Sequence, residues 1–423
     1  MLKLNEIKKE DIFIRNNEAA NVEKTVTEII ENVRNRKDEA LYEYCEKFDK
    51  VRLDELAVNQ KEIADALEQC DPEFLEVIKE AADNIRCFHE KQVRNSFIIN
   101  EKEGVITGQK IVPIEKVGIY VPGGTAAYPS SVLMNALPAK IAGCKEVVMV
   151  TPPSKDGSVD PGILAAAYVV GIDRIFKVGG AQAIAALAYG TQSIPKVDKI
   201  VGPGNAYVAE AKKQVYGMAS IDMIAGPSEI LVIADGKSDE RFVAADLLSQ
   251  AEHDRMSSAV LVTDSLELAQ KTAQEIEVQL ERLERKEIAR ASIDNNGKII
   301  VADDLNEAID IANQIAPEHL ELCVDNPFDY LDLIKNAGSI FLGRNCPEAI
   351  GDYFAGTNHI LPTLGTARFS SPLSVDDFIK KMQYTYYSKS ALDKISNKVA
   401  LFAKKEGLEG HGRSVLIRTE EKL

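Results

Sequence analysis

The sequence predicts an α/β fold of two tandem Rossmann-like parallel-sheet units. Short continuous apolar runs recur along the chain, helical stretches separate most of them, and several end in glycine turns. Strands that alternate with helices form parallel sheets through right-handed crossovers. Parallel strands are buried on both faces and therefore consist of continuous apolar runs. A chain of 423 residues, of which 45% are hydrophobic, is long enough for two or three cores.

The N-terminal part of the chain has a different sequence pattern from the rest. Residues 1–14 are polar and predict a short arm, and residues 22–90 predict helices. In TVTEIIENV, helical spacing places four apolar side chains on one buried stripe, namely Val26, Ile29, Ile30 and Val33.

From about residue 111 onward, apolar runs predict strands in two series. The first series lies at 117–121, 146–150, 174–178, 198–202 and 229–234. The second lies at 259–263, 298–302, 320–324 and 339–343. We therefore expect one α/β unit built on 111–229 and another on 230–370.

Some early helices have the apolar faces needed to pack on the second unit, and this sets the predicted domain boundaries. The domains are an arm at 1–14, a first α/β domain of 15–119 together with 230–370, a second α/β domain of 120–229, and a helical C-terminal tail at 371–423. Before the tail, TARFSSPLS (366–374) is typical of a linker. Ser374 and Asp377 then form a plausible capping box.

Four strand ends run into glycine turns, at 121–131, 178–187, 201–211 and 225–230. Glycine lets backbone amides approach a ligand, and a following helix N-terminus favours an anion. Ligands of doubly wound sheets bind at the carboxyl ends of the strands. The turns together favour a crevice for a phosphate-bearing ligand, although tight βα turns alone explain any one of them. Neither GxGxxG nor a P-loop sequence is present.

Composition excludes several classes of partner. A net charge of −16 without a basic stripe argues against nucleic acid. No apolar window reaches the roughly 18 residues of a membrane span, and the N-terminus lacks the apolar core of a signal peptide. The six cysteines form no CxxC pair and suit a reducing cytoplasm. Cys346 is the most loop-like candidate for a reactive thiol, but nothing nearby marks it as activated.

Two groups of polar residues indicate metal or acid–base chemistry. In LLSQAEHD, Gln250 and His253 are three residues apart and would share one face of a helix. His359 follows Asp352 by seven residues. Imidazole and carboxylate are ligands that Zn²⁺ accepts, and a catalytic zinc keeps a position open for substrate. Because the candidates are scattered along the chain, a structural role for each histidine stays open.

Glu318 and His319 are adjacent in the segment APEHLE. On a loop, neighbouring residues can offer two bases to one pocket, and imidazole titrates close to neutral pH. The alternative is an ordinary surface loop after a proline.

The segment IDMIAGPSEILVIADGKSDERFVAADLLSQAEH (221–253) closely resembles the signature stretch of histidinol dehydrogenases. VGIYVPGG, VGGAQAIAALAYGT, KVDKIVGPGN, APEHLE and GDYFAGTNHILPT resemble the other hallmark blocks of that family, in the same order. The resemblance covers nearly the whole chain. The glycine turns of that family also lack the usual GxGxxG dinucleotide fingerprint.

The resemblance implies oxidation of L-histidinol to L-histidine through L-histidinaldehyde, with two NAD⁺ reduced, as the last steps of histidine biosynthesis. It implies one Zn²⁺ per subunit, held by Gln250, His253, Asp352 and His411. It implies NAD⁺ contacts from Tyr120, Gln182 and Asn205. It implies substrate contacts from Ser228, Gln250, His253, His319, Asp352, Glu406 and His411.

Each catalytic residue receives a role from the same resemblance. His319 is implied as the base that takes the alcohol proton, and Glu318 as the group that activates water against the aldehyde. The 15–119 and 230–370 domain would then carry the metal and catalytic residues, and the 120–229 domain the NAD⁺ side. The family also implies a homodimer with an exchanged tail, so that Glu406 and His411 of the partner subunit complete each site.

Three other interpretations stay open at this point. A relative of the same fold could oxidise another polyol or amino alcohol, such as a sulfopropanediol, at the same metal and NAD⁺ sites. The tail pair Glu406 and His411 favours histidinol over these. A zinc hydrolase would need no cofactor crevice, and a non-catalytic binding protein would need no base beside a glutamate.

Overall fold

The computed structural model describes residues 22–123, 127–172 and 174–420, so the expected arm at 1–14 lies outside the described residues. The described chain divides into two compact units. The first contains the described residues up to Gln92 and Ile114–Phe378, and the second contains Val93–Pro113 and the residues from Ile379 onward.

The first unit contains two parallel sheets, and the first of these has the order β5-β4-β3-β6-β7. Its strands are β3 (Lys116–Tyr120), β4 (Glu146–Thr151), β5 (Arg174–Lys177), β6 (Lys199–Val201) and β7 (Ser220–Ile221). The helices that follow four of them are α5 (Pro129–Ala142), α6 (Pro161–Val169), α7 (Gly180–Tyr189) and α8 (Ala206–Val215). The central strands are buried, as their continuous apolar sequences predict.

The N-terminal helices pack on this first sheet and its helices. They are α1 (Glu23–Arg36), α2 (Asp38–Tyr44), α3 (Gln60–Gln69) and α4 (Pro72–Glu90), with a π-helical turn at Cys45–Asp49. Val26 and Ile30 of α1 share a core with Ile184 of α7, and Ile85 of α4 shares one with Leu137 of α5. The predicted grouping of residues 15–119 with 230–370 is therefore wrong for these helices. An apolar stripe predicts that a face is buried, but not which sheet covers it.

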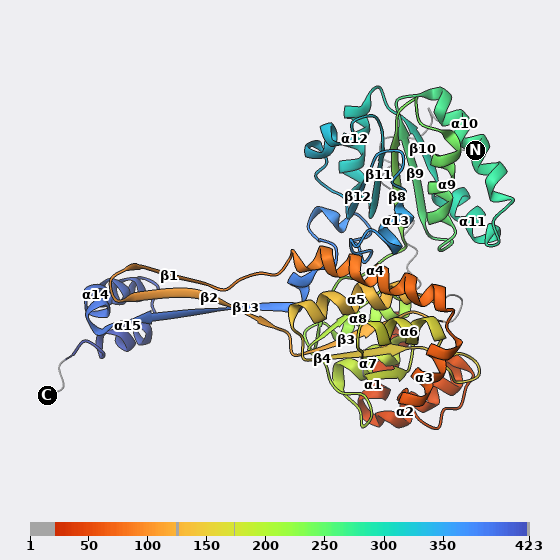
Figure 1. Ribbon diagram of the computed structural model, residues 1–423. Coiled ribbons are helices and arrows are strands. Elements are labelled where there is room, and N and C mark those ends of the chain that lie inside the picture. Colours follow the sequence, from red (N-terminus) through yellow and green to blue (C-terminus); the bar gives the residue numbers. More distant parts are fainter. Residues whose placement is uncertain (1–21, 124–126, 173, 421–423) are drawn as a thin grey trace. The chain divides into compact units, whose positions relative to one another are not determined.

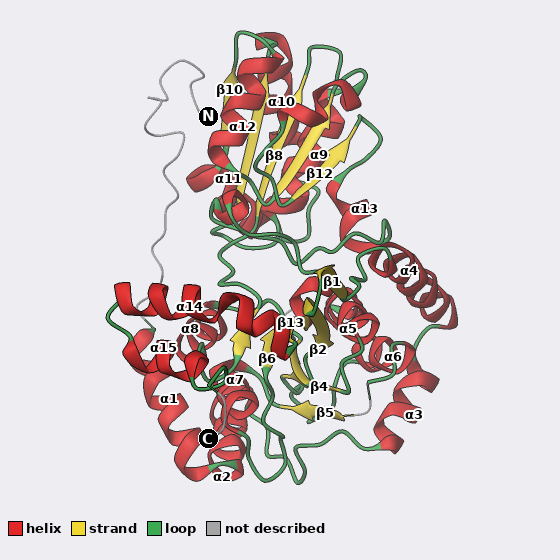
Figure 2. Cartoon of the chain, turned by 90° about the vertical axis from the view of Figure 1, so that its left-hand side faces the viewer, coloured by secondary structure: helices red, strands yellow, loops and turns green. Residues whose placement is uncertain are grey.

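The second sheet of the first unit is also parallel, with the order β10-β9-β8-β11-β12 (Figure 2). Its strands are β8 (Glu229–Ala234), β9 (Ser258–Thr263), β10 (Lys298–Val301), β11 (His319–Cys323) and β12 (Ser339–Leu342). Its helices are α9 (Glu240–Ala251), α10 (Leu266–Leu280), α11 (Lys286–Asn296), α12 (Leu305–Ile315) and α13 (Glu348–Tyr353). The two tandem Rossmann-like sheets predicted from the apolar runs are confirmed.

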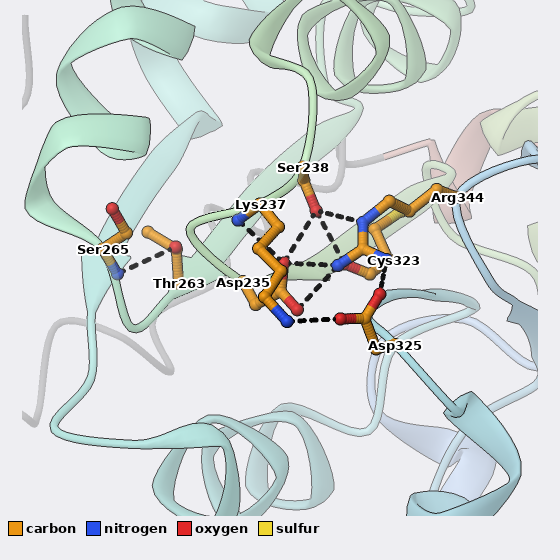
Figure 3. Close-up of polar contacts among 8 residues, drawn as sticks. All are labelled: Asp235, Lys237, Ser238, Thr263, Ser265, Cys323, Asp325 and Arg344. Carbon is orange, nitrogen blue, oxygen red and sulfur yellow. Dashed lines mark hydrogen bonds and ion pairs between the residues drawn. The ribbon is translucent and has the colours of Figure 1, made fainter.

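Both sheets have the same topology, in which the first strand lies centrally and the fourth pairs on its other side. Such a switch point opens a crevice at the carboxyl ends of the two strands. In the second sheet an ionic cluster occupies this end (Figure 3). Arg344 pairs with Asp235 at 2.6 Å and with Asp325 at 2.5 Å, and Ser238 donates to the carbonyl of Cys323 at 2.7 Å.

The second unit is an antiparallel sheet with two helices, and Figure 1 shows α14 and α15 together at the end of the sheet where the β1–β2 turn lies. The strand order is β1-β2-β13, formed by β1 (Phe97–Lys102), β2 (Val105–Pro113) and β13 (Ile379–Tyr387). The helices are α14 (Lys389–Lys405) and α15 (Glu409–Leu416). The predicted helical tail at 371–423 is thus corrected, because its first element in this unit is a strand.

The boundary before the second unit also differs in detail from the prediction. The backbone N–H of Ser374 donates to Asp377 at 2.9 Å, but the helix that follows is a single 3₁₀ turn, Val375–Phe378, rather than a long α-helix. Among the helices of the described residues, none is long and apolar enough to cross a membrane.

Candidate active site

The predicted pair Glu318–His319 lies at the amino end of β11, beside the amino end of β8. Parallel pairing sets His319 opposite Ile230, and this brings the backbone of Glu229 between the two side chains. The N–H of Glu229 donates to Oε2 of Glu318 at 2.8 Å. Its carbonyl accepts from Nδ1 of His319 at 3.0 Å. One residue of a neighbouring strand therefore orients both predicted catalytic side chains.

The hydrogen bond to Glu229 also fixes the tautomer of His319. A carbonyl oxygen only accepts, so the proton lies on Nδ1 and the lone pair on Nε2. Nε2 is buried without a hydrogen-bond partner. It lies 3.6 Å from Oε1 of Glu348 and 3.9 Å from Oδ1 of Asp352. The arrangement leaves a neutral imidazole with a vacant basic nitrogen directed at an acidic cluster.

Burial shifts both groups of the pair toward their neutral forms. Loss of solvation lowers the pKa of His319 to about 4, although the nearby Asp352 charge acts in the opposite direction. Burial also raises the pKa of Glu318 well above its usual range, against the stabilising hydrogen bond from Glu229. Perturbed groups that face each other in a buried site are typical of acid–base catalysis.

The short helix α13 brings Glu348 and Asp352 to the same site. The two are four residues apart, so they share one face of the helix. Sequence reasoning selected Asp352 but not Glu348, whose side chain is 3% exposed. One signal could have identified Glu348: it is an acidic residue in the loop-like segment NCPEAIGD, four residues before the candidate ligand Asp352.

The predicted pair Gln250–His253 does not lie on one helix face. α9 ends at Ala251, and His253 follows in a turn whose N–H donates to the carbonyl of Gln250 at 3.2 Å. Gln250 is fully buried, and its side-chain amide lies against Glu348; in the amide orientation that satisfies both groups, the nitrogen donates to Oε2 at 2.9 Å. His253 is exposed, yet near enough that its charge lowers the pKa of His319.

His359 completes the surroundings of Asp352. Its Nδ1 donates to the carbonyl oxygen of Asp352 at 3.0 Å, and burial lowers its pKa below the ordinary histidine value. Ser228, a predicted substrate contact, directly precedes Glu229, and its carbonyl accepts from the N–H of Ser258 at 3.0 Å. Ser228 thus lies next to the residue that orients the catalytic pair.

The predicted cofactor contacts lie in or beside turns at the carboxyl ends of the first sheet. Tyr120 ends β3, and its hydroxyl accepts from the N–H of Gly180 at 3.1 Å. Burial raises its pKa to about 12. Gln182 is buried in the first turn of α7. Asn205 caps α8, with Oδ1 accepting from the N–H of Tyr207 at 3.1 Å.

The two remaining predicted residues belong to the second unit. Glu406 follows the last residue of α14, and His411 lies in α15; both are exposed. The structure therefore brings Glu318, His319 and Asp352 together within the first unit, and describes Glu406 and His411 in a separate one.

The donor atoms of the first unit suit a borderline metal ion. Nε2 of His319 and oxygens of Glu348 and Asp352 all lie within 4.8 Å of one another. This geometric group shares Asp352 with the ligand set implied by resemblance, and adds His319 and Glu348. Gln250 contacts Glu348, and the imidazole of His253 lies close by. Imidazole nitrogen and carboxylate oxygen are the donors that Zn²⁺ accepts, so these residues fit the expected ion.

Fold and site together define an α/β protein with a buried acid–base centre at the amino end of one parallel sheet and glycine turns at the carboxyl end of the other. A family model described as histidinol dehydrogenase matches residues 14–419. The chain therefore belongs to the histidinol dehydrogenase family, whose members are oxidoreductases of histidine biosynthesis.

Individual relatives agree with this assignment. A histidinol dehydrogenase of Clostridium acetobutylicum is 57% identical over 95% of this chain and 93% of its own length. One of Listeria monocytogenes is 56% identical over 99% of this chain and 97% of its own. The crystal structure of histidinol dehydrogenase from Elizabethkingia anophelis matches with a TM-score of 0.92 and 43% identity, covering 96% of this chain and 94% of that one.

Proposed function

We propose that this protein oxidises L-histidinol to L-histidine through L-histidinaldehyde, in a zinc-dependent reaction that reduces two NAD⁺. The observation that carries the proposal is the fixed tautomer of His319, whose vacant Nε2 lies buried beside Glu348 and Asp352. A hydrolase needs no nucleotide cofactor, so the glycine turns at the strand ends would have no role in it. A binding protein would have no use for a buried base next to a glutamate.

The metal would be held by Gln250, His253 and Asp352, together with His411 of the partner subunit. Bound Zn²⁺ supplies Lewis acidity and a fixed anchor for the substrate, and it carries no electrons because it has no redox chemistry. Bound NAD⁺ supplies the acceptor for each hydride.

In the first oxidation, Nε2 of His319 takes the hydroxyl proton of the alcohol while the carbinol carbon gives up a hydride. The low pKa of the free imidazole means that it enters the step neutral and able to accept that proton. The carbonyl of Glu229 stabilises the imidazolium that forms, because it already accepts from Nδ1.

In the second oxidation, Glu318 takes a proton from water as its oxygen attacks the aldehyde carbon. The hydrate that forms then loses its hydride, and its remaining acidic proton passes to His319, which has by then released the first proton to solvent, giving the carboxylate. Burial raises the pKa of Glu318, which makes the ionised form a stronger base than an exposed glutamate. The N–H of Glu229 holds one carboxylate oxygen and leaves the other for the water.

We further propose that Glu406 and His411 act across a homodimer, each completing the partner subunit's site. Their placement in a unit separate from the catalytic pair is compatible with such an exchange. A stable monomer with full activity would contradict this part of the proposal.

The deciding experiment measures NADH formed per L-histidinol consumed, by absorbance, on protein of known metal content. We expect two NADH per histidinol, loss of activity with a chelator, and recovery with added Zn²⁺. Absence of NADH from histidinol by zinc-loaded protein would contradict the proposed substrate, and other amino alcohols and polyols would then be assayed.

A further inference from the structure

A second group of acidic side chains lies directly behind the site, on the same three elements. Glu321 follows His319 by two residues on β11, so both side chains point to one face of the sheet. Asp246 precedes Gln250 by four residues on α9, and Glu348 precedes Asp352 by four on α13. β11 and α9 thus each carry one residue of the site and one acid behind it, and α13 carries two residues of the site, Glu348 and Asp352.

Glu321 connects two of these elements through the backbone. Its Oε1 accepts from the N–H of Glu348, the first residue of α13, at 2.7 Å. The N-cap of α13 is Pro347, which offers no side-chain acceptor. The first N–H groups of a helix have no partner within it. Glu321 therefore supplies, from a neighbouring strand, the acceptor that a capping side chain would normally provide.

The carboxylate of Glu321 also lies close to the third element, α9. Oxygens of Glu321 and Asp246 lie within 4.8 Å of each other, in a group that includes the thiol of Cys323. Glu321 is 1% exposed, and its Oε2 finds no donor if both groups are carboxylates.

We propose that Glu321, which lies between the N-terminus of α13 and Asp246 of α9, is a positioning residue that holds α13, and with it Asp352, in register with His319 and Gln250. The inference rests on the proposed function, because it assigns Glu321 and Asp246 to the support of that site. Neither residue touches the reacting atoms in this arrangement. Their effect passes through the N-terminus of α13.

The test compares two substitutions of the same residue. Glu321→Gln keeps the shape of the side chain: its amide oxygen can accept from the N–H of Glu348, and its amide nitrogen can donate to Asp246. Glu321→Leu removes both contacts and leaves the N–H of Glu348 without an acceptor. If the leucine variant does not fold, Glu321→Ala removes the same acceptor while leaving space for water, and the same expectations apply.

Ser238→Ala is the matched control. Ser238 is buried and donates to the carbonyl of Cys323, at the opposite end of β11 from His319. Its loss weakens the same strand without touching α13. Any general effect of loosening the second sheet should therefore be present in this variant as well.

Two measurements decide the outcome. Amide hydrogen exchange of the segment 347–353 needs neither metal nor substrate, and zinc affinity is obtained by competition with a chelator. We expect Glu321→Leu to raise the exchange rate and to weaken zinc binding about 10- to 100-fold, with Glu321→Gln and Ser238→Ala close to the unsubstituted protein in both.

Unchanged exchange in Glu321→Leu would overturn the proposal, as would equal damage in Glu321→Gln or in Ser238→Ala. If the unsubstituted protein takes up no zinc, the proposed function fails, whereas hydrogen exchange still decides whether Glu321 anchors α13.

Discussion

The carbonyl oxygen of Glu229 accepts a hydrogen bond from Nδ1 of His319 at 3.0 Å, across the pairing of β8 with β11. This contact assigns the imidazole proton and exposes the lone pair of Nε2 to the acidic side chains of α13. The N–H of the same Glu229 holds Glu318 at 2.8 Å. The backbone of Glu229 thereby orients both Glu318 and His319, which are adjacent in sequence and have different chemical roles.

Substitution of His319 by asparagine separates the hydrogen bond that the imidazole donates to Glu229 from the basic nitrogen that the imidazole offers at Nε2. The amide nitrogen of the asparagine side chain would still donate to Glu229, but no basic nitrogen would occupy the position of Nε2. We expect His319→Asn to lower turnover about 10²- to 10⁴-fold, with zinc content and histidinol binding nearly unchanged. Steady-state kinetics and metal analysis of the same preparation check this. A parallel loss of zinc would mean that His319 is a ligand rather than a base.

Substitution of Glu318 by glutamine should separate the two half-reactions. The amide oxygen still accepts from the N–H of Glu229, so the strand pairing is preserved, but the group no longer takes a proton from water. We expect oxidation of L-histidinaldehyde to slow about 10²-fold or more, and oxidation of L-histidinol to the aldehyde to slow much less. Single-turnover assays started from each substrate measure this, and equal losses would refute the water-activating role.

The parallel sheets were predictable because their strands are buried on both faces. Runs such as EILVIA need no periodicity to be recognised, and all six residues of β8 are buried. The strands of the second unit gave no such signal. β1 is exposed at every position although it begins with Phe97, Ile98 and Ile99, and β13 is exposed at all but its first position, so neither has the longer continuous apolar run of a strand that is buried on both faces. The helical tail was consequently predicted to begin too early.

The site could be predicted only in part for a similar reason. Glu318 and His319 are adjacent, so the sequence alone places them together. Glu229 orients this pair through its backbone and lies about ninety residues away in the sequence. Its side chain therefore gives no indication of this role. Glu348 lies on a helix of six residues, which is too short for a pattern of burial to emerge. Contacts that depend on strand register or on short helices can be identified only in the folded chain.

The turn after β6 allows a test of the cofactor region. Gly202 has a φ of +114°, and an added Cβ would lie 2.1 Å from the carbonyl oxygen of Tyr120. Gly202→Ala should therefore displace the turn that leads to Asn205 and raise the KM for NAD⁺ more than that for histidinol. Gly217 has a φ of +99° with nothing within 4 Å of the added Cβ, so Gly217→Ala serves as the control.

We expect Gly217→Ala to cost about 1–3 kcal/mol of stability from backbone strain alone, without a change in KM for NAD⁺. Gly202→Ala adds a backbone collision to a comparable strain and should lower the free energy of unfolding further. Thermal denaturation and steady-state kinetics of the two variants provide the comparison. Equal KM values for NAD⁺ in both variants would remove the turn at Gly202 from the cofactor site.

Stability at acid pH should depend on His89, a fully buried residue outside the catalytic pair. Its Nδ1 donates to the carbonyl of Ile85 at 2.9 Å, and its Nε2 lies 3.4 Å from the amide nitrogen of Asn358. The amide of Asn358 is fixed, because it also donates to Met134 at 2.8 Å. A proton on Nε2 would therefore face another donor. Burial lowers the pKa of His89 below its ordinary value, although hydrogen bonds to the backbone of Ile85 and Leu373 act in the opposite direction.

A histidine whose pKa is lowered by folding binds its proton more readily in the unfolded chain. Its contribution to stability is complete above the unfolded pKa of about 6.5 and is lost as the pH falls toward the folded pKa. The difference in unfolding free energy between the unsubstituted protein and His89→Gln should thus shrink between pH 7 and pH 5, by at most about 1.4 kcal/mol per pH unit. Urea denaturation at several pH values measures it. A difference that stays constant over this range would show that His89 takes up no proton on unfolding.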